Sequence, residues 1–365
     1  MVSPTMPDPR NSSLYLAFDP LFFEHRSRGY HPERPERLEA ARRGLARCES
    51  AGAQVVALAP RDATDAEILA AHDAAYLAEL KKLEGHYASL DADTYLAPAS
   101  LAAARRAAGG AIALAEALVA AGEGDPKQGV ALLRPPGHHA TRHQGMGFCL
   151  LNNVALAAYA ALARGLSRVA IVDWDVHHGN GTQDIFWTDD RVLFVSLHES
   201  PLYPGTGAAR EIGEGRGRGY TLNIPLPASS NDAVYRLAFD EIVLPALHRY
   251  APELVLVSAG FDGHARDPLA SMLLTDVGYG WMARALRDVA DATAGGRIGL
   301  VLEGGYDLPA IEASMAAAIQ GALGSPAPAP SSEVGPRHAE AVEQIREAVE
   351  AAGPVQVTEA TSPVR

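Results

Sequence analysis

Short runs of apolar, often β-branched residues alternate along this chain with longer stretches in which apolar residues recur at helical spacing. The short runs are residues 130–133, 169–172, 192–196, 254–257 and 298–302. The helical stretches are residues 101–121, 155–164, 233–250 and 279–294. Wholly apolar strands that alternate with helices are typical of a parallel sheet covered on both faces. The pattern therefore predicts an α/β fold, a three-layer sandwich with a central, mostly parallel sheet and helices on both faces.

The pattern changes after Leu323, where GSPAPAPSSEVGP forms a linker rich in Pro, Ala and Ser. Beyond this linker, three apolar residues fall on one helical stripe: Val342, Ile345 and Val349. We expect a short amphipathic helix here that either docks on the domain or stays mobile, followed by a tail. The predicted organisation is a flexible N-terminal tail, one large catalytic domain, and a C-terminal linker, helix and tail, at 1–13, 14–323 and 324–365.

Composition excludes several classes of protein. The net charge of −13 and the isoelectric point near 5.4 disfavour binding to nucleic acid or to an anionic membrane. No apolar run approaches the roughly 18 to 20 residues that a membrane helix needs, and residues 1–13 lack the features of a secretion signal. The two cysteines, Cys48 and Cys149, argue against a disulfide framework. We therefore expect a cytoplasmic protein without nucleic-acid or membrane partners, and a homo-oligomer remains open.

Polar clusters directly follow all five predicted strands. In chain order they read RPPGHHA, DWDVHHGN, SLHES, SAGFDGH and EGGYD. Parallel strands present their carboxyl ends at one edge of the sheet, and in open α/β sheets that edge is where ligands bind. The polar clusters should therefore converge, which is the condition that a metal site requires.

The cluster after residue 172 is rich in metal-binding side chains. Alternate side chains of an extended backbone face the same way, so Asp173, Asp175 and His177 can share one face. One aspartate could simply cap the next helix, but three such residues within five exceed what capping needs. Asp262, at a neighbouring strand end, is placed to add a third strong ligand. Two carboxylates and one imidazole with an open position suit a catalytic Zn²⁺, or Fe²⁺ or Mn²⁺.

The tandem histidines His138 and His139 follow a Pro-Pro-Gly sequence. Adjacent residues can point into one site only from irregular backbone, which this sequence supplies. Two surface histidines in a turn are the alternative interpretation. The polar clusters at the other strand ends favour a pair that acts as general acid and base near neutral pH.

Three aromatic residues lie in the segments that follow predicted strands. Tyr306 of EGGYD offers a hydroxyl that can polarise a carbonyl or hold an oxyanion, and the two glycines before it allow close approach of the backbone. Taken alone, this motif favours a tyrosine that is merely packed at a strand end. Phe148 and Tyr203 could wall a narrow slot at the same edge, although either could equally be a core aromatic residue.

The ordered set of motifs resembles a known family. It runs from HPERPERL at 31–38 through RPPGHHA, GFCLLNN, VDWDVHHGNGTQ, SLHESPLYPGTG and GFDGHARDPLA to LEGGY. In this order the motifs are similar to those of zinc-dependent histone deacetylases, of the bacterial class II-like kind within the arginase/deacetylase superfamily. The resemblance covers roughly residues 14–323. It implies an arginase/deacetylase-like fold, Zn²⁺ as the catalytic metal, structural K⁺, and hydrolysis of acetyl or acyl amides.

The resemblance also implies individual roles. Asp175, His177 and Asp262 would bind the metal, while Tyr306 and the metal polarise the acyl carbonyl. His139 would take a proton from water, and a protonated histidine would return one to the leaving amine. Asp173 would orient His138. Residues implied around the acyl-lysine tunnel and the internal cavity behind the metal are Gly147, Phe148, Tyr203, Leu269 and, in that cavity, Arg34.

Two monovalent-cation sites, usually occupied by potassium, are implied by the same resemblance. The first would use Asp173, Asp175, His177, Ser196 and Leu197. The second would use Phe186, Asp189, Val192 and Tyr220. A cation beside the aspartate-rich segment would stabilise its buried carboxylates and change the basicity of the nearby histidines.

Two positions bear on the subclass and the substrate. Asn180 stands where class I relatives carry an aspartate that supports the second tandem histidine, so His139 should be less basic here, as in the class II pattern. Leu269 stands where relatives specialised for acetylated polyamines can carry an acidic gatekeeper. An apolar residue there fits a neutral acyl-lysine or small acyl tail better than a polycation.

Three functions therefore compete. The leading hypothesis is a metal-dependent amidohydrolase that acts on acetyl-lysine in proteins or peptides, and the second is a deacetylase of small acetylated amines such as acetylpolyamines. The third is a non-catalytic acyl-lysine- or metal-binding module, which the intact tandem histidines and Tyr306 argue against. A two-metal arginase-like hydrolase is disfavoured because His264 replaces the second aspartate expected two residues after Asp262.

Overall fold

The centre of the molecule is an eight-stranded sheet in the order β2-β1-β5-β10-β9-β6-β7-β8, in which all neighbouring strands are parallel. The structure is a computed structural model that describes residues 13–351. Its strands are β1 (Ser13–Ala17), β2 (Gln54–Ala57), β5 (Gln128–Ala131), β6 (Val169–Asp173), β7 (Val192–Glu199), β8 (Thr221–Leu226), β9 (Leu254–Ala259) and β10 (Ile298–Leu302). A separate antiparallel ribbon joins β3 (Ala88–Ser89) and β4 (Tyr95–Leu96).

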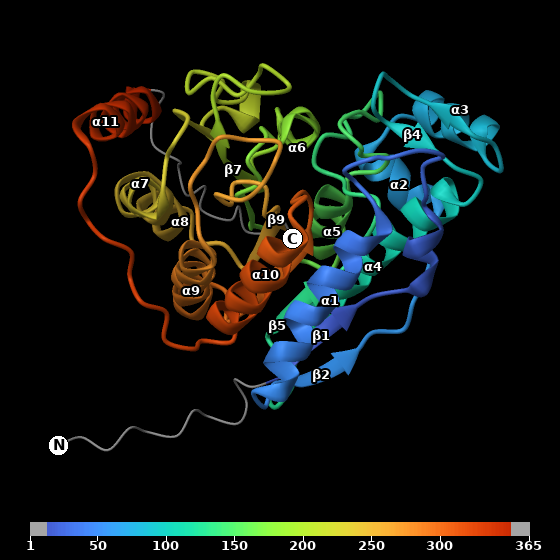
Figure 1. The fold of residues 1–365 in the computed structure, drawn as a ribbon, viewed down its shortest axis with the longest axis horizontal. Coiled ribbons are helices and arrows are strands. Elements are labelled where there is room, and N and C mark those ends of the chain that lie inside the picture. The colour runs from blue at the N-terminus through green and yellow to red at the C-terminus, as the bar shows by residue number, and fades with distance from the viewer. Residues whose placement is uncertain (1–12, 352–365) are drawn as a thin grey trace, which may run out of the picture.

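Helices cover both faces of this sheet (Figure 1). One layer contains α1 (Pro35–Ser50), α9 (Asp276–Thr293) and α10 (Leu308–Ala322), and the opposite layer contains α4 (Ser100–Ala120) and α5 (Asn153–Ala163). The remaining helices are α2 (Asp65–Ala71), α3 (Ala74–Leu83), α6 (Asn180–Phe186), α7 (Asp232–Ala238), α8 (Leu244–Tyr250) and α11 (Pro336–Ala351), with 3₁₀ turns at Pro20–Glu24 and Gly215–Gly217. The predicted three-layer α/β fold is confirmed.

The inner strands are buried along their whole length, as their apolar sequences predict. Every residue of β5, β6, β7, β9 and β10 is buried. The predicted strand at 130–133 lies two residues earlier, at Gln128–Ala131. The predicted helix at 233–250 is divided by a π-helical turn at Phe239–Val243. Pro245 follows this turn and has no N–H to donate, which favours irregular hydrogen bonding there.

Strands β1, β2 and β8 are absent from the sequence prediction. The β8 sequence TLNIPL contains Asn223 and Pro225, which strands usually avoid. Because β8 is an edge strand of the sheet, the missing N–H of its proline does not remove a hydrogen bond between inner strands. The position of the strand in the sheet, which its sequence does not encode, makes these residues acceptable.

The C-terminal helix α11 contacts β8 and α7. Val342 and Ile345, two residues of the predicted stripe, are only 1% and 6% exposed. The sequence left open whether this helix docks on the domain or stays mobile, and in the structure it is docked. Apart from Ser13, the predicted N-terminal tail lies outside the described residues, and so does the predicted tail after α11. Within residues 13–351, no helix combines the length and apolarity that crossing a membrane would require.

Candidate active site

The polar clusters that follow the strands meet at the carboxyl edge of the sheet. Asp173 ends β6, Asp262 follows β9, and Tyr306 follows β10, while the tandem histidines follow β5. In the sheet order, β5, β10, β9 and β6 are successive neighbours. Their ends therefore bring together residues that lie far apart in the sequence.

Asp175, His177 and Asp262 form one compact group of possible metal ligands, whose ligand atoms all lie within 4.8 Å of one another. His177 Nδ1 is 3.2 Å from both Asp175 Oδ1 and Asp262 Oδ2. The other carboxylate oxygens accept backbone N–H groups, from Gly304 to Asp175 Oδ2 at 2.8 Å and from Val176 to Asp262 Oδ1 at 2.9 Å. A Cβ at Gly304 would lie 2.2 Å from Asp262 Oδ2, so the backbone approach requires glycine.

The electrostatics of this group fit a bound divalent cation. Burial opposes protonation of His177, but its hydrogen bonds with Asp175 and Asp262 raise its pKa to about 10. Burial and the charge of Asp175 raise the pKa of Asp262. Two buried carboxylates thus compete for positive charge at one imidazole nitrogen. Two oxygen donors and one nitrogen donor suit Zn²⁺, Fe²⁺ or Mn²⁺, and a divalent cation would relieve the repulsion between the carboxylates.

The tandem histidines occupy different environments although they are adjacent in sequence. His138 Nδ1 lies 3.0 Å from Asp173 Oδ2, whereas His139 Nδ1 lies 2.7 Å from Asn180 Oδ1. Burial opposes protonation of His138, but the charges of Asp175 and Asp173 raise its pKa well above the usual value. Burial and the charges of His138 and His177 lower the pKa of His139 well below it. The surroundings therefore favour a proton on His138 and disfavour one on His139.

The hydrogen bond that His139 donates to Asn180 also fixes the tautomer of His139. The Asn180 amide oxygen can only accept, so His139 Nδ1 carries the proton and Nε2 keeps a lone pair. The irregular backbone expected before these histidines is present, with a cis peptide bond between Arg134 and Pro135. His178, the other histidine of the aspartate-rich segment, instead bonds Thr206 and Gln183.

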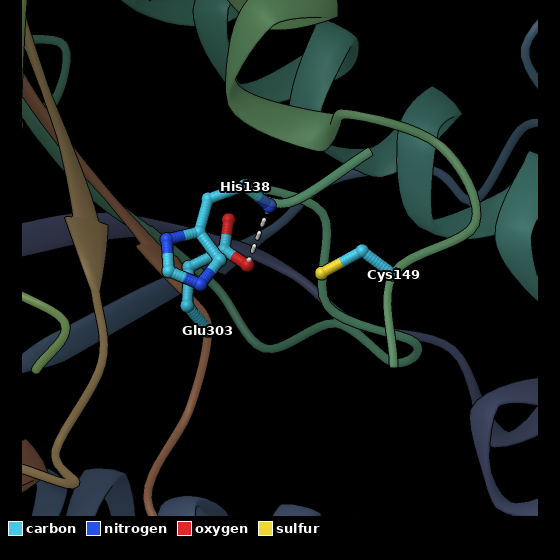
Figure 2. A group of neighbouring side chains, drawn as sticks. All are labelled: His138, Cys149 and Glu303. Carbon is cyan, nitrogen blue, oxygen red and sulfur yellow. Dashed lines mark hydrogen bonds between the residues drawn. The ribbon is translucent and has the colours of Figure 1, made fainter. Parts of the chain in front are cut away.

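Glu303 is a site residue that the sequence reasoning missed. It lies beside His138 and Cys149 (Figure 2), and the three offer ligand atoms within 4.8 Å of one another. Its Oε2 accepts the N–H groups of Gly137 at 2.7 Å and His138 at 3.2 Å. Burial raises the pKa of Glu303 to about 7. A glutamate directly after a wholly apolar strand was the signal that could have identified it.

A cavity of about 450 Å³ opens onto these groups. The predicted tunnel residues Gly147, Phe148, Tyr203 and Leu269 line it. Further lining residues are His31, Pro32, Ala92, Asp93, Pro136, His138, His139, His177, Leu202, Gly304 and Tyr306. His31, Pro32 and Asp93 were not predicted, although His31 and Pro32 begin the HPERPERL motif. The cavity walls are therefore mainly aromatic and apolar around a polar floor.

The aromatic walls are held by contacts among the predicted residues. The Phe148 ring lies 5.9 Å from that of Tyr306, and the Tyr203 ring lies 5.2 Å from that of His139, both edge to face. Gly147 has a φ of 55°, and a Cβ there would lie 2.4 Å from the His139 ring. Glycine is therefore needed at 147 for the wall to approach the tandem histidines.

The buried arginine behind Tyr306 is Arg37, whereas the sequence reasoning chose Arg34. Arg34 is half-buried, precedes α1 as its N-cap and does not line the cavity. Arg37, one helical turn later, is fully buried, lies 4.9 Å over the Tyr306 ring and donates to the Gly305 and Glu303 carbonyls. The first turn of α1 places residue 37 inward, which the motif alone does not reveal. Burial raises the pKa of Tyr306 well above its usual value.

The residues of the two predicted cation sites have different surroundings in the structure. Asp173 pairs with Ser196 in the β6–β7 register, next to the other residues of the first set. In the second set, the Asp189 carboxylate accepts three hydrogen bonds from Arg191, two from its guanidinium at 2.8 and 2.5 Å and one from its backbone N–H at 3.0 Å. The Phe186 carbonyl accepts the Asp189 N–H. Both potassium sites stay predictions.

Comparisons with known proteins agree with this geometry. Residues 31–322 match the histone deacetylase domain, and the chain belongs to the histone deacetylase family. A probable deacetylase of Archaeoglobus fulgidus is 40% identical over 298 residues, which are 80% of this chain and 81% of that protein. A histone deacetylase-like amidohydrolase of Pseudomonas aeruginosa is 47% identical over 248 residues, which are 67% and 64% of the two chains. These relatives support hydrolase activity of the deacetylase class.

A solved structure shares the fold along nearly the whole chain. The crystal structure of the HDA15 HD domain superposes with a TM-score of 0.86 at 37% sequence identity, and the match covers 94% of this chain and 95% of that one. The arginase/deacetylase-like fold expected from the motifs is thereby confirmed. The family is metal-dependent, and the group of Asp175, His177 and Asp262 provides a place for the metal.

Proposed function

We propose that this protein is a metal-dependent amidohydrolase that removes acetyl or acyl groups from acetyl-lysine in proteins or peptides. One observation carries the proposal: the tandem histidines, each hydrogen-bonded to a different polar partner, lie beside three metal-ligand side chains, and Tyr306 lines the same cavity. Hydrolysis of an amide requires a base for water, an acid for the leaving amine and a group that stabilises the carbonyl oxygen. The site supplies a candidate for each.

Zn²⁺, or Fe²⁺ or Mn²⁺, held by Asp175, His177 and Asp262 would act as a Lewis acid and lower the pKa of a water molecule. His139 Nε2 accepts a proton from the attacking water molecule, whose oxygen forms a bond to the acyl carbon. The Tyr306 hydroxyl donates a hydrogen bond to the acyl oxygen, where negative charge develops. His138, held by Asp173, supplies positive charge nearby.

Proton transfer then completes the reaction. A protonated histidine of the tandem pair returns a proton to the amine nitrogen as the carbon–nitrogen bond breaks. The products are the free amine and a carboxylate, so that water is consumed and no other reactant is needed. The neutral Asn180 leaves His139 free of a paired negative charge, which suits a base that must also release its proton.

The shape and polarity of the cavity support an acyl-lysine side chain as the substrate. Its walls include Phe148, Tyr203 and Leu269, which would cover the apolar methylene groups of the lysine. One residue favours small acetylated amines as the second candidate. Asp93, also at the cavity, could pair with a free ammonium group of a polyamine. The buried thiols of Cys48 and Cys149, which form no disulfide, support a cytoplasmic location.

The test is to purify the protein, measure its bound metal, and assay an acetyl-lysine peptide beside N-acetylputrescine. We expect faster turnover of the peptide. Tyr306→Phe should lower kcat by about 10²–10³-fold through loss of an oxyanion donor, and His139→Ala by about 10²–10⁴-fold through loss of the base. Tyr87→Phe, at an exposed tyrosine outside the cavity, is the matched control. A metal-loaded protein that hydrolyses neither substrate would refute both enzyme hypotheses.

A further inference from the structure

The carboxylate of Asp267 joins two loops of the cavity wall. It is only 7% exposed, and its two oxygens accept three backbone N–H groups. Oδ1 accepts from Leu269 at 3.1 Å, while Oδ2 accepts from Tyr306 at 2.6 Å and Asp307 at 3.3 Å. Leu269 follows β9 and Tyr306 follows β10, and both side chains line the cavity. One buried side chain therefore connects the candidate carbonyl polariser to the opposite loop.

The Tyr306 backbone depends on such an external anchor. It follows two glycines, and Gly305 has a φ of 114°, a conformation that gives the chain little intrinsic preference for one path. Asp307 is the N-cap of α10, and its Oδ1 accepts the N–H of Ala310 at 2.9 Å. Tyr306 thus lies between a two-glycine segment, which Asp175 and Arg37 contact, and the start of a helix. The hydrogen bond to Asp267 fixes the one backbone N–H in between.

We propose that Asp267 is a positioning residue that holds the Tyr306 backbone against the Leu269 loop and so sets the place of the Tyr306 hydroxyl in the cavity. This inference rests on the proposed function, in which Tyr306 polarises the acyl carbonyl. A displacement of about 1 Å in a reacting group can cost about 100-fold in rate. Loss of the anchor should therefore lower kcat more than it raises KM.

The partly buried carboxylate of Asp232 provides the comparison for a purely structural role. Asp232 accepts the N–H of Thr275 at 2.9 Å and its hydroxyl at 2.6 Å, and so joins the starts of α7 and α9. Asp232 does not line the cavity. Asp232→Ala should lower the melting temperature and leave kcat within about twofold, whereas Asp267→Ala should change kcat.

The decisive experiment is a double-mutant cycle on the metal-loaded protein, with bound metal, kcat and KM measured for each variant on the acetyl-lysine peptide. Asp267→Ala should lower kcat by about 10–100-fold with KM within about threefold. In the Tyr306→Phe background, the same change should cost less than about threefold, because the hydroxyl it positions is gone. Asp267→Asn keeps one acceptor oxygen and should lie between wild type and Asp267→Ala; it also serves if the alanine variant does not fold.

Equal losses of kcat in both backgrounds, an effect on KM alone, or loss of bound metal would each overturn the positioning role. Failure of the wild-type protein to hydrolyse either substrate would refute the proposed function instead. In that case, the same double-mutant cycle can be measured through the binding affinity of a hydroxamate inhibitor. Weaker hydroxamate binding in Asp267→Ala but not in the Tyr306→Phe background supports the positioning role, and equal weakening in both overturns it.

Discussion

The carboxyl edge of the sheet and the C-terminal helix α11 both bury side chains against the same central sheet, but the buried chemistry differs. At the edge, Asp173, Asp175 and Asp262 are fully buried charged groups. On α11 the buried groups are Val342 and Ile345, and the charged residues remain at the surface, as in the Arg346–Glu343 pair. Buried charges cost stability unless they are paired, whereas buried apolar groups supply it.

The comparison teaches where mutations should affect activity and where they should affect stability. At the edge, buried charges cost stability, but the same groups provide the reactive site. The helix is an apolar anchor whose surface ion pairs contribute little. We therefore expect substitutions at the edge to change metal binding or activity, and substitutions on α11 to change stability.

The largest effect is expected for Asp262→Asn. The amide oxygen can still accept the Val176 N–H, but the charged metal ligand is lost. Removal of a group that merely supports a ligand already costs about 10–100-fold in metal affinity, so we expect a loss of more than about 100-fold here. Metal titration with a competing chelator measures it. Asp240→Asn, at a surface carboxylate, is the control, and unchanged affinity in Asp262→Asn would contradict the assigned ligand set.

A smaller effect, on stability alone, is expected for Val342→Asp. An unpaired carboxylate at this buried position should undock α11 and remove about 1.5–3 kcal/mol of apolar burial. Limited trypsin digestion and hydrogen exchange should show α11 exposed, while kcat/KM stays within about twofold. Glu347→Ala, at an exposed position on the same helix, should leave both measurements unchanged. A large loss of activity would show that the two regions are coupled.

Asn180→Asp tests the electrostatics of the edge more finely. A carboxylate at 180 would face His139 Nδ1 and raise the pKa of His139. Because a general base acts only when it is unprotonated, the acidic limb of the kcat/KM profile should move to higher pH. The pH profiles of the two proteins, measured at equal metal occupancy, provide the comparison. An unchanged limb would show that His139 does not set it.

The smallest effect is expected for the contribution of His72 to the pH dependence of stability. His72 is a buried histidine outside the metal group. Its Nδ1 donates to the Thr141 carbonyl at 2.8 Å and its Nε2 accepts the Asn152 N–H at 3.0 Å. Burial lowers the pKa of His72 to about 4, so the folded state binds fewer protons than the unfolded state, where the value is near 6.5. Its contribution to stability is present above pH 6.5 and is lost as the pH falls toward 4.

Between about pH 7 and pH 5.5 this linkage should remove about 1 kcal/mol from the free energy of unfolding. Urea denaturation at both pH values measures it. His72→Gln should show a pH dependence that is weaker by that amount, while His86→Gln, at an exposed histidine, should behave like the wild type. An identical pH dependence in His72→Gln would contradict the prediction.

Much of the site was predictable because its residues follow wholly apolar strands. The alternation of Asp173, Asp175 and His177, and the expectation that strand ends converge, needed only the geometry of extended chains and parallel sheets. The edge strand β8 was not predictable, because its Asn and Pro residues are acceptable only at the border of a sheet. The choice of Arg34 instead of Arg37 has a similar origin, since both occur in one motif and only packing decides which one points inward.

The sequence by itself determined the alternation of strands and helices, the tandem histidines, the spacing of the aspartates and the presence of an amphipathic C-terminal helix, because these depend on local periodicity. Only the tertiary structure decided which distant groups meet. Glu303 contacts the His138 backbone across 165 residues, and Asp267 contacts Tyr306 across 39. Such contacts depend on strand order and loop packing, since no local pattern encodes the distance between the ends of two strands.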